Sequence, residues 1–275
     1  MSDERKYRVP ILTYHSIDDS GSVISTSRET FRRQMRHLSE TGYRTISLRD
    51  LARDLDEKRP LPVNTVVITF DDGYQNIYAE AFPVLAEYGF LATVFLITDY
   101  CARTNDWPGN GAGIPRQQLL SWREIKEMQQ QGFEFGSHTM THLDLTTVSL
   151  ACAEDELRRS RMAIEERLGE QASVFAYPYG SYNSAIKSIV QKHFIAACST
   201  KLGKVELGSD PFLLRRVDTY YLSTDRMFGG LASRSLERYL QFRQGLREVK
   251  TLGRRVSRQF QAAQVSLERK ASASN

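Results

Sequence analysis

The chain alternates short apolar runs with stretches whose apolar residues recur at helical spacing. The apolar runs, rich in β-branched and aromatic residues, predict strands over 9–15, 43–48, 66–70, 90–97, 133–137, 173–177, 194–198 and 213–217. The stretches between them predict helices over 27–41, 51–55, 77–88, 122–131, 150–168 and 184–192. Strands that alternate with helices imply a parallel sheet, and seven or eight such units close into a barrel.

Local signals set the ends of several of these helices. Thr26 and Ser121 each precede a glutamate by three positions, which is the pattern of a capping box at a helix start. Gly42 and Gly132 are typical of helix ends. Pro83 predicts a kink or a restart inside the helix that contains it.

With 275 residues, of which 41% are hydrophobic, the chain can bury one large core. The net charge of +4 is modest for this length and does not favour nucleic-acid binding. The charge is uneven, because residues 234–270 carry ten Lys and Arg against three Glu, a net +7. We therefore predict one barrel domain over 1–233 and a basic helical extension over 234–275.

The basic extension has two interpretations, because its apolar residues recur at helical spacing with arginines between them. In the first, its helices pack on the barrel and expose a solvated basic face. In the second, it binds peripherally to anionic lipid or to a membrane-bound assembly.

Nothing in the sequence predicts export. Cys101, Cys152 and Cys198 lack the spacing of a disulfide framework or of a structural zinc site. Residues 1–8 are polar, and the apolar run that follows is too short for a signal peptide. No stretch reaches the roughly 18 apolar residues that a spanning helix needs. We expect a cytoplasmic protein, peripheral at the inner membrane if the extension binds lipid.

Chemically active residues follow the predicted strands. His15 is the last residue of the first strand, Asp71 and Asp72 follow the third, and His138 and His142 follow the fifth. Strand carboxyl ends meet on one face of a barrel, where catalytic groups lie. Two histidines and a carboxylate leave open positions on a metal ion, as catalytic sites do. Such a pair of histidines alone is more often two surface residues, but the adjacent aspartates favour a metal site.

Three motifs, in this order and at these separations, resemble the first three motifs of the polysaccharide deacetylases of carbohydrate esterase family 4, the NodB-homology domain. They are Thr69-Phe70-Asp71-Asp72-Gly73, Ser137-His138-Thr139-Met140-Thr141-His142 and Tyr177-Pro178-Tyr179-Gly180. The similarity spans residues 10–223, most of the chain. It implies an α/β fold, a distorted (β/α)7-type barrel. It also implies a hydrolase that removes N-acetyl groups from an amino-sugar glycan with the help of a metal, releasing acetate.

Carried over onto this sequence, the resemblance implies roles for five residues. Asp72, His138 and His142 would bind a divalent metal, and Asp71 would be the general base that takes a proton from water. Tyr179 matches the position whose backbone N–H stabilises the oxyanion. Zinc is our first choice, and iron, cobalt, nickel or manganese also suit two histidines and one carboxylate.

Two departures from the family pattern matter. Many members have an Arg that orients the base where this chain has Ala176, and many carry a late Leu-x-His that supplies the acid, yet no histidine follows His193. Both departures resemble the branch of exopolysaccharide deacetylases acting on poly-N-acetylglucosamine, in which a histidine placed like His15 is the acid. The sequence leaves open a structural role for His15. It also leaves open whether Arg215 or Arg216 replaces the missing Arg.

Aromatic residues near the predicted strand ends have two interpretations. The long loop over 99–117, which contains Trp107, predicts a lid or a substrate wall. The side chains either stack on sugar rings or pack within the rim, and this holds for Trp107, Tyr74 and Tyr182. The predicted partner is an N-acetylated glycan or its lipid-linked or nucleotide-linked precursor. Two other functions remain open: an amidohydrolase for another C–N bond, of cyclic ureide type, and a catalytically inactive carbohydrate-binding module.

Overall fold

The computed structural model describes residues 8–61, 63–111 and 113–249. The chain divides into two compact units, Met1–Ala232 and Ser233–Asn275. The first unit holds the strands and the candidate site. Within the second unit, the described residues form a helix over 234–249.

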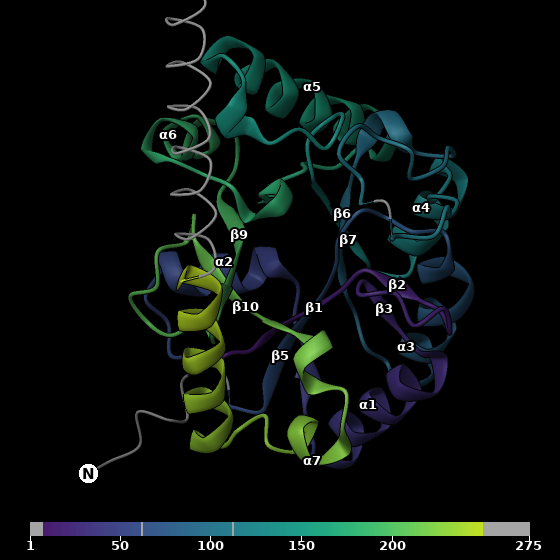
Figure 1. The fold of residues 1–275 in the computed structure, drawn as a ribbon, viewed down its shortest axis with the longest axis vertical. Coiled ribbons are helices and arrows are strands. Elements are labelled where there is room, and N and C mark those ends of the chain that lie inside the picture. Colours follow the sequence, from purple (N-terminus) through teal and green to yellow (C-terminus); the bar gives the residue numbers. More distant parts are fainter. Residues whose placement is uncertain (1–7, 62, 112, 250–275) are drawn as a thin grey trace, which may run out of the picture. The chain divides into compact units, whose positions relative to one another are not determined.

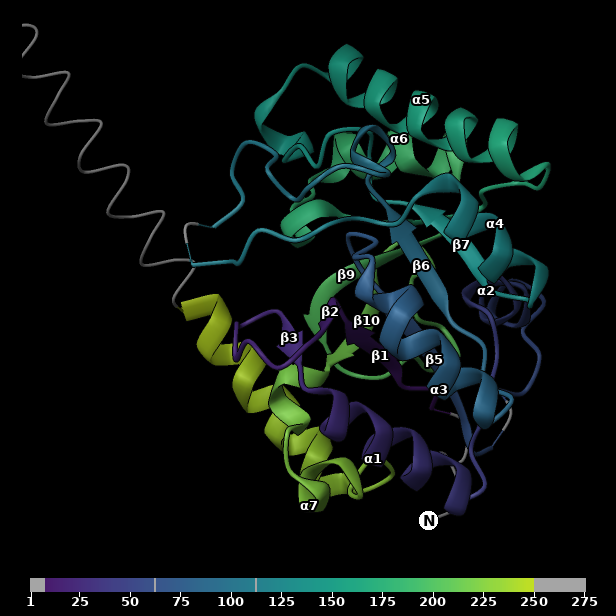
Figure 2. The same cartoon turned by 90° about the vertical axis from the view of Figure 1, so that its right-hand side faces the viewer.

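Parallel strands close into a seven-membered ring in the first unit (Figures 1 and 2). Around the ring follow β1 (Ile11–Tyr14), β10 (Leu214–Asp218), β9 (Ala196–Leu202), β8 (Val174–Ala176), β7 (Glu134–Ser137), β6 (Thr93–Leu96) and β5 (Thr65–Phe70). The ring closes where β5 pairs with β1, with Ile11 beside Val67 and Tyr14 beside Phe70. A further strand, β4 (Arg44–Thr45), pairs with the start of β5 outside the ring. The predicted seven-unit barrel is confirmed.

Helices connect the strands (Figure 1). They are α1 (Arg28–Glu40), α2 (Leu48–Asp56), α3 (Phe82–Glu87), α4 (Trp122–Gln130), α5 (Leu150–Leu168), α6 (Ser184–His193) and, after the last strand, α7 (Asp225–Phe228). Ser121 and Glu124 form the predicted capping box at the start of α4. The box predicted at Thr26 is wrong, because the side chain of Ser27 caps α1 by accepting the N–H of Thr30.

Three other local features differ from the predicted elements. The strand predicted over 43–48 is only two residues long, because Ser47 accepts the N–H of Asp50 and begins α2. A small parallel pair, β2 (Ser16–Ile17) with β3 (Ser25–Thr26), was not predicted. Before α3 the chain forms a π-helical turn, Ile77–Ala81. Pro83 lies in the first turn of α3, where its missing N–H breaks no helical bond.

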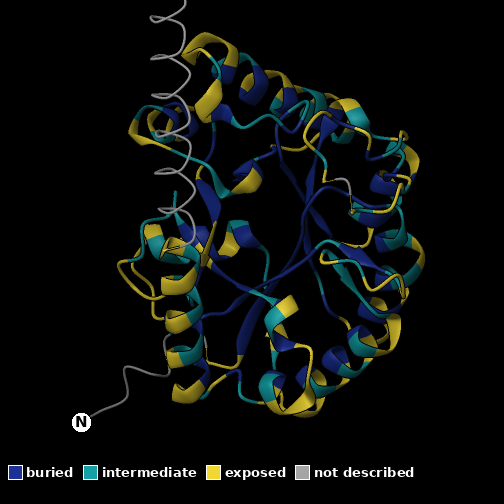
Figure 3. Ribbon diagram, viewed as in Figure 1, coloured by how far each residue is buried: buried dark blue, intermediate teal, exposed yellow. Residues whose placement is uncertain are grey.

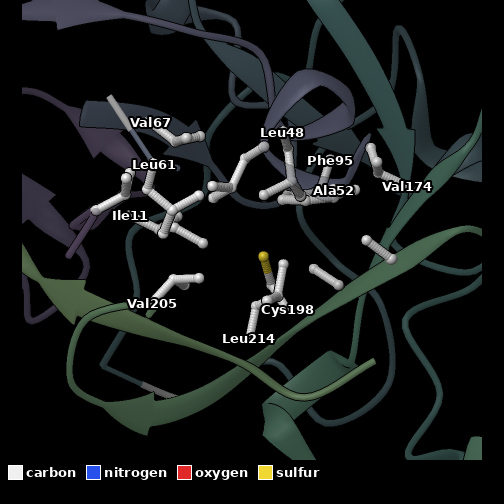
Figure 4. Packing of buried hydrophobic residues seen from close by; sticks show 14 residues of the cluster. Ile11, Leu48, Ala52, Leu61, Val67, Phe95, Val174, Cys198, Val205 and Leu214 are labelled. Atoms are coloured by element: carbon white, nitrogen blue, oxygen red, sulfur yellow. The ribbon is translucent and has the colours of Figure 1, made fainter. Parts of the chain in front are cut away.

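The barrel interior is filled by alternate residues of the strands and by one face of α2 (Figure 4). The cluster comprises Val9, Ile11, Leu48, Leu51, Ala52, Leu61, Val67, Phe95, Val174, Ala176, Ala196, Cys198, Val205 and Leu214. Since three of these belong to α2, this helix closes the end at which the strands begin. A Cβ at Gly136 would lie 2.8 Å from both Phe95 and Val174, so only glycine fits there. Figure 3 shows the ring strands as largely buried, with exposed positions in β9 and β10, and the outer helix faces as exposed.

The described part of the second unit is the helix over 234–249, and the remainder of the predicted extension, 250–275, lies outside the described residues. Among the residues that the structure describes, no helix combines the length and the hydropathy that crossing a membrane requires.

Candidate active site

Asp71 and Asp72 lie where β5 ends and the backbone turns. Asp71 still follows the strand and donates its N–H to the carbonyl of Tyr14 at 3.0 Å. Asp72 has a φ of 69° and Gly73 one of 72°, both in the left-handed region. In an extended strand the side chains of consecutive residues would point to opposite faces. Because the backbone turns here, both carboxylates reach groups at the barrel mouth. Both are buried, with exposed fractions of 3% and 7%.

Asp72, His138 and His142 form a compact buried cluster. The Nε2 atom of each histidine lies 3.4 Å from Asp72 Oδ1, and one ligand atom from each residue lies within 4.8 Å of the other two. His138 Nδ1 is 2.8 Å from the carbonyl oxygen of Ala176. Because a carbonyl only accepts, this Nδ1 carries a proton, and Nε2 is the ring nitrogen that faces Asp72.

The electrostatics of this cluster suit a metal ion. Asp72 Oδ1 is buried and has no hydrogen-bond partner in the described part of the chain, and burial raises the pKa of this carboxyl. Burial, followed by the nearby His138, lowers the pKa of His142, which keeps that imidazole neutral. A buried carboxylate oxygen without a donor is costly, and two imidazoles with one carboxylate form a ligand set that divalent metals use. The three residues therefore fit a divalent ion.

The two histidines lie on a loop and not on a helical turn. His138 follows β7 directly, while Thr139 and His142 have φ values of 67° and 62°, outside the right-handed helical region. Thr139 Oγ1 accepts the N–H of His142 at 2.9 Å, which closes the loop. The four-residue spacing thus brings the imidazoles together through a left-handed turn.

Asp71 forms a two-pronged ion pair with Arg216 of β10. Arg216 Nη1 donates to Asp71 Oδ1 and Nη2 to Oδ2, each at 2.7 Å, and Nε donates to the carbonyl of Ser199 at 3.0 Å. Burial alone would raise the pKa of Asp71, but the charge and hydrogen bonds of Arg216 outweigh it and hold that pKa well below its usual range. Arg215 is exposed on the opposite face of β10. Of the two arginines that the sequence left open, Arg216 is therefore the one that contacts Asp71, the predicted base.

His15 and Tyr179 complete the predicted set. His15, directly after β1, places its Nε2 3.9 Å from Asp71 Oδ2, and its side chain is 30% exposed. Tyr179 lies in the turn Pro178–Gly180 with a φ of 59°. Its hydroxyl is 3.0 Å from His142 Nδ1. The structure thus brings all six predicted residues to one end of the barrel, and their catalytic roles stay predictions.

The aromatic residues correct one interpretation. Tyr74 and Trp107 are buried, with exposed fractions of 0% and 3%, so neither can stack on a sugar ring. Trp107 instead packs its ring against His142, with centroids 5.0 Å apart. Tyr182 is half-buried and contacts Lys201. The rim tyrosine that exposes its ring beside the cluster is Tyr179, which is 48% exposed.

Sequence reasoning missed two supporting contacts. The phenol of Tyr179 contacts His142, whereas the motif assigned a role only to its backbone. Glu156 of α5 is buried against the histidine loop. No spacing links Glu156 to the motifs, because a helix approaches the loop from outside the barrel, and only the three-dimensional structure reveals the contact.

Comparison with known proteins agrees with this geometry. The family model described as polysaccharide deacetylase matches residues 58–197, which include Asp71, Asp72, His138, His142 and Tyr179. The chain belongs to the polysaccharide deacetylase family. The family recognised from the sequence is thereby confirmed, as is the enzyme class, a hydrolase of carbohydrate esterase family 4.

Relatives of this deacetylase are found among named proteins and solved structures. It is 30% identical to YxkH of Bacillus subtilis, whose name describes a polysaccharide deacetylase. The match covers 78% of this chain and 72% of YxkH. It is 29% identical to the poly-β-1,6-N-acetyl-D-glucosamine N-deacetylase of Staphylococcus epidermidis over 62% of this chain. The matched region is 65% of that enzyme's length, slightly under two thirds.

Two solved structures resemble the barrel closely. IcaB from Ammonifex degensii superposes with a TM-score of 0.69 at 25% identity, covering 83% of this chain and 97% of that one. The deacetylase PplD of Streptococcus pyogenes, in complex with acetate, superposes with a TM-score of 0.67 at 26% identity, covering 77% and 92%. Both likenesses extend beyond the motifs to most of the first unit.

Proposed function

We propose that this protein is a metal-dependent N-deacetylase that hydrolyses N-acetyl groups of an amino-sugar glycan. The observation that carries the proposal is the adjacency of two differently equipped carboxylates. Asp71 is held ionised by Arg216, while an oxygen of Asp72 without a hydrogen-bond donor among the described residues faces two imidazoles. One carboxylate is thus ready to accept a proton beside a site that fits a divalent ion.

The reaction exchanges an amide C–N bond for a C–O bond. A divalent ion, when bound by Asp72, His138 and His142, supplies a Lewis acid that polarises the acetyl carbonyl and lowers the pKa of water. Asp71 accepts the proton of the attacking water, and His15 protonates the amine as the C–N bond breaks. His15 suits this role because it lies beside Asp71 and remains partly exposed to an incoming sugar.

The negative charge that forms on the acetyl carbonyl oxygen when water attacks needs a hydrogen-bond donor. In the proposal this donor is the backbone N–H of Tyr179, in the left-handed turn beside His142. The acetate then leaves, and the product carries a free amine. Zinc is the first candidate ion, and iron, cobalt, nickel or manganese also suit this ligand set.

For the substrate we propose an N-acetylated glucosamine polymer or its precursor. The support is the similarity to the staphylococcal enzyme, whose name specifies poly-β-1,6-N-acetyl-D-glucosamine. A second support is the place of His15 beside Asp71, since the sequence resembles the branch in which a histidine at this position is the acid.

Acetate release tests this function. Purified protein is incubated with β-1,6- and β-1,4-linked N-acetylglucosamine oligomers, with and without a chelator, and with zinc restored afterwards. We expect release that the chelator abolishes and the metal restores. Turnover of a small cyclic ureide with no acetate from any sugar would favour the other amidohydrolase. Glycan binding without turnover, in protein that holds no metal, would favour a carbohydrate-binding module.

We further propose that the second unit binds peripherally to anionic membrane, which would place the enzyme at the inner face of the cytoplasmic membrane beside a lipid-linked or nucleotide-linked precursor. Along the helix over 234–249, Phe242, Leu246 and Val249 recur at helical spacing and are 63%, 48% and 71% exposed. Arg238 and Arg243 lie on the same helix. Exposed apolar side chains with interleaved arginines are typical of interfacial helices, and each basic residue near an anionic surface contributes about 1 kcal/mol.

Vesicle sedimentation tests this association. The full chain is mixed with vesicles of anionic and of zwitterionic lipid at low and high salt. We expect binding to the anionic vesicles that weakens as salt rises and that decreases in a Phe242→Ser, Leu246→Ser variant. Equal recovery in the supernatant with both lipids at low salt would refute the proposal, as would an exported protein in fractionated cells.

A further inference from the structure

Glu156 is a buried carboxylate whose hydrogen bonds all go to the loop between the two histidines. One oxygen, Oε2, accepts the N–H of Met140 at 2.9 Å and that of Thr141 at 3.0 Å. The other, Oε1, accepts the hydroxyl of Thr141 at 2.8 Å. Glu156 lies on α5 and is 5% exposed, so water is largely excluded from this contact.

The charge of Glu156 is balanced by the loop itself. Among the ion pairs of the described residues, none involves Glu156, since the neighbouring Arg158 and Arg159 both pair with Asp155. Removing a carboxylate from water is unfavourable unless donors replace the lost water. Here the replacement donors are two consecutive backbone N–H groups and one hydroxyl. The carboxylate and this loop conformation therefore depend on each other.

The conformation that Glu156 holds is one the loop would not adopt readily by itself. Thr139 and His142, on either side of the held residues, are both in the left-handed region, which residues with a Cβ rarely occupy. That conformation returns the chain so that Nε2 of His142 meets Asp72 Oδ1 at the same distance as Nε2 of His138. A relaxed loop would move His142 and leave Asp72 and His138 in place.

We propose that Glu156 is a positioning residue that presets the histidine loop, so that His142 joins Asp72 and His138 before an ion binds. The proposal rests on the proposed function in so far as the three residues bind a metal. If so, the contacts of Glu156 within the fold supply the free energy that orders the histidine loop, and metal binding does not have to provide it.

The chain offers a matched control in Glu134. This residue is also buried, and its Oε2 accepts the N–H of Leu48 at 3.0 Å, the N–H of Arg49 at 3.3 Å and the hydroxyl of Thr93 at 2.7 Å. The donor set is the same as at Glu156, but it lies at the opposite end of the barrel, where α2 begins. Glu134 additionally pairs with Arg49 Nε at 3.4 Å.

The test compares Glu156→Ala, Glu156→Gln and Glu134→Gln in the full chain. Zinc affinity of the apo protein is measured by calorimetry, together with amide hydrogen exchange at Met140 and Thr141. We expect Glu156→Ala to weaken zinc binding about 10- to 100-fold and to lose protection at both amides. Glu156→Gln should recover much of both, because its carboxamide oxygen can still accept the two N–H groups. Glu134→Gln should leave zinc affinity within about twofold while lowering thermal stability.

Two results would overturn the proposal: wild-type zinc affinity and amide protection in Glu156→Ala, or an equal loss of affinity in Glu134→Gln, which would indicate general destabilisation. If Glu156→Ala does not fold, Thr141→Val removes only the hydroxyl donor, and a smaller loss of affinity is expected. Amide exchange in apo protein requires neither metal nor substrate. It therefore decides on Glu156 even if no glycan is deacetylated and the proposed function fails.

Discussion

The neighbouring carboxylates Asp71 and Asp72 have opposite surroundings on two sides of the barrel mouth. On one side, both oxygens of Asp71 accept hydrogen bonds from Arg216 at 2.7 Å. On the other, Asp72 Oδ1 has no donor among the described residues and lies 3.4 Å from two imidazole nitrogens. Burial raises the pKa of both carboxyls, but only at Asp71 does a cation reverse the shift.

The difference shows that the partner, and not the residue type or its burial, decides what a buried carboxylate can do. Because Arg216 supplies its cation, Asp71 is ionised before any ligand binds. It can therefore exchange a proton with a ligand that arrives. Asp72 has no such partner and gains one only when a cation binds. The following substitutions test this division of roles.

Asp72→Ala should have the largest effect, because it removes the oxygen that faces both imidazoles. We expect loss of bound zinc and of all acetate release, with a circular dichroism spectrum like that of the wild type. Asp106→Ala, which removes an exposed carboxylate of the rim loop, is the control and should retain both. Full activity of Asp72→Ala in chelated, metal-free protein would end the one-metal interpretation.

Asp71→Asn should come next, because it removes a proton acceptor and no ligand. We expect unchanged zinc content and a fall in kcat of about 10²- to 10⁴-fold. The substitution also leaves Arg216 buried without its counter-charge, so the double variant Asp71→Asn, Arg216→Met is the matched stability control. A parallel fall in metal content would show that the two roles were assigned wrongly.

Arg216→Met should convert the surroundings of Asp71 toward those of Asp72. In the wild type, the folded pKa of Asp71 lies below its unfolded value. The ion pair therefore contributes stability at neutral pH, which is lost as the pH falls through that lowered pKa. Without Arg216, only the weaker effects of His15 and His138 oppose burial, so the pKa of Asp71 rises and the acid limb of kcat should move to higher pH. Loss of the partner should cost about 3–5 kcal/mol at neutral pH.

A pH–rate profile and thermal unfolding at several pH values check the Arg216→Met prediction. Stability of the variant should increase as the pH falls and Asp71 takes up a proton. Arg215→Met, which alters the exposed neighbour on β10, should change neither curve. An unmoved acid limb in Arg216→Met would mean that the limb belongs to another group.

Tyr179→Phe should have the smallest effect. It deletes the hydroxyl 3.0 Å from His142 Nδ1, and loss of such outer contacts lowers metal affinity about 10- to 100-fold. We expect the lower end, because Tyr179 is 48% exposed and water can replace the hydroxyl. Zinc titration measures it, with Tyr220→Phe, another exposed tyrosine, as control. An effect as large as that of Asp72→Ala would mean that the phenol acts on the reacting atoms.

The sequence predicted what depends on local pattern. Alternating apolar runs predicted the parallel strands, and the capping box at Ser121 predicted the start of α4. The ordered motifs predicted that Asp72, His138 and His142 lie together, because the carboxyl ends of parallel strands meet at one end of a barrel. The box at Thr26 failed because two adjacent hydroxyl residues compete to be the cap, and the backbone conformation at Ser27 decides between them.

What the sequence could not predict depends on tertiary approach. The choice between Arg215 and Arg216 depends on which face of β10 points inward. A shift of the strand by one residue would exchange the two side chains, and the short apolar run did not fix this position. Glu156 contacts the histidine loop from a helix, and Trp107 packs against His142 from a distant loop. None of these contacts has a fixed sequence spacing.

The ion pair between Asp71 and Arg216 also has a consequence for biosynthesis, since 145 positions separate the two residues in the chain. At about 5–20 residues per second, a ribosome would take roughly 7–30 s to add the arginine after the aspartate. During that interval β10 does not exist, β1 lacks one of its two ring neighbours, and Asp71 has no cation to keep it charged in a dry environment. A nascent chain, or one cut short before β10, therefore has Asp72, His138 and His142, but its Asp71 is protonated or exposed to solvent. In the proposed mechanism, efficient deacetylation at neutral pH therefore begins only after β10 has joined β1.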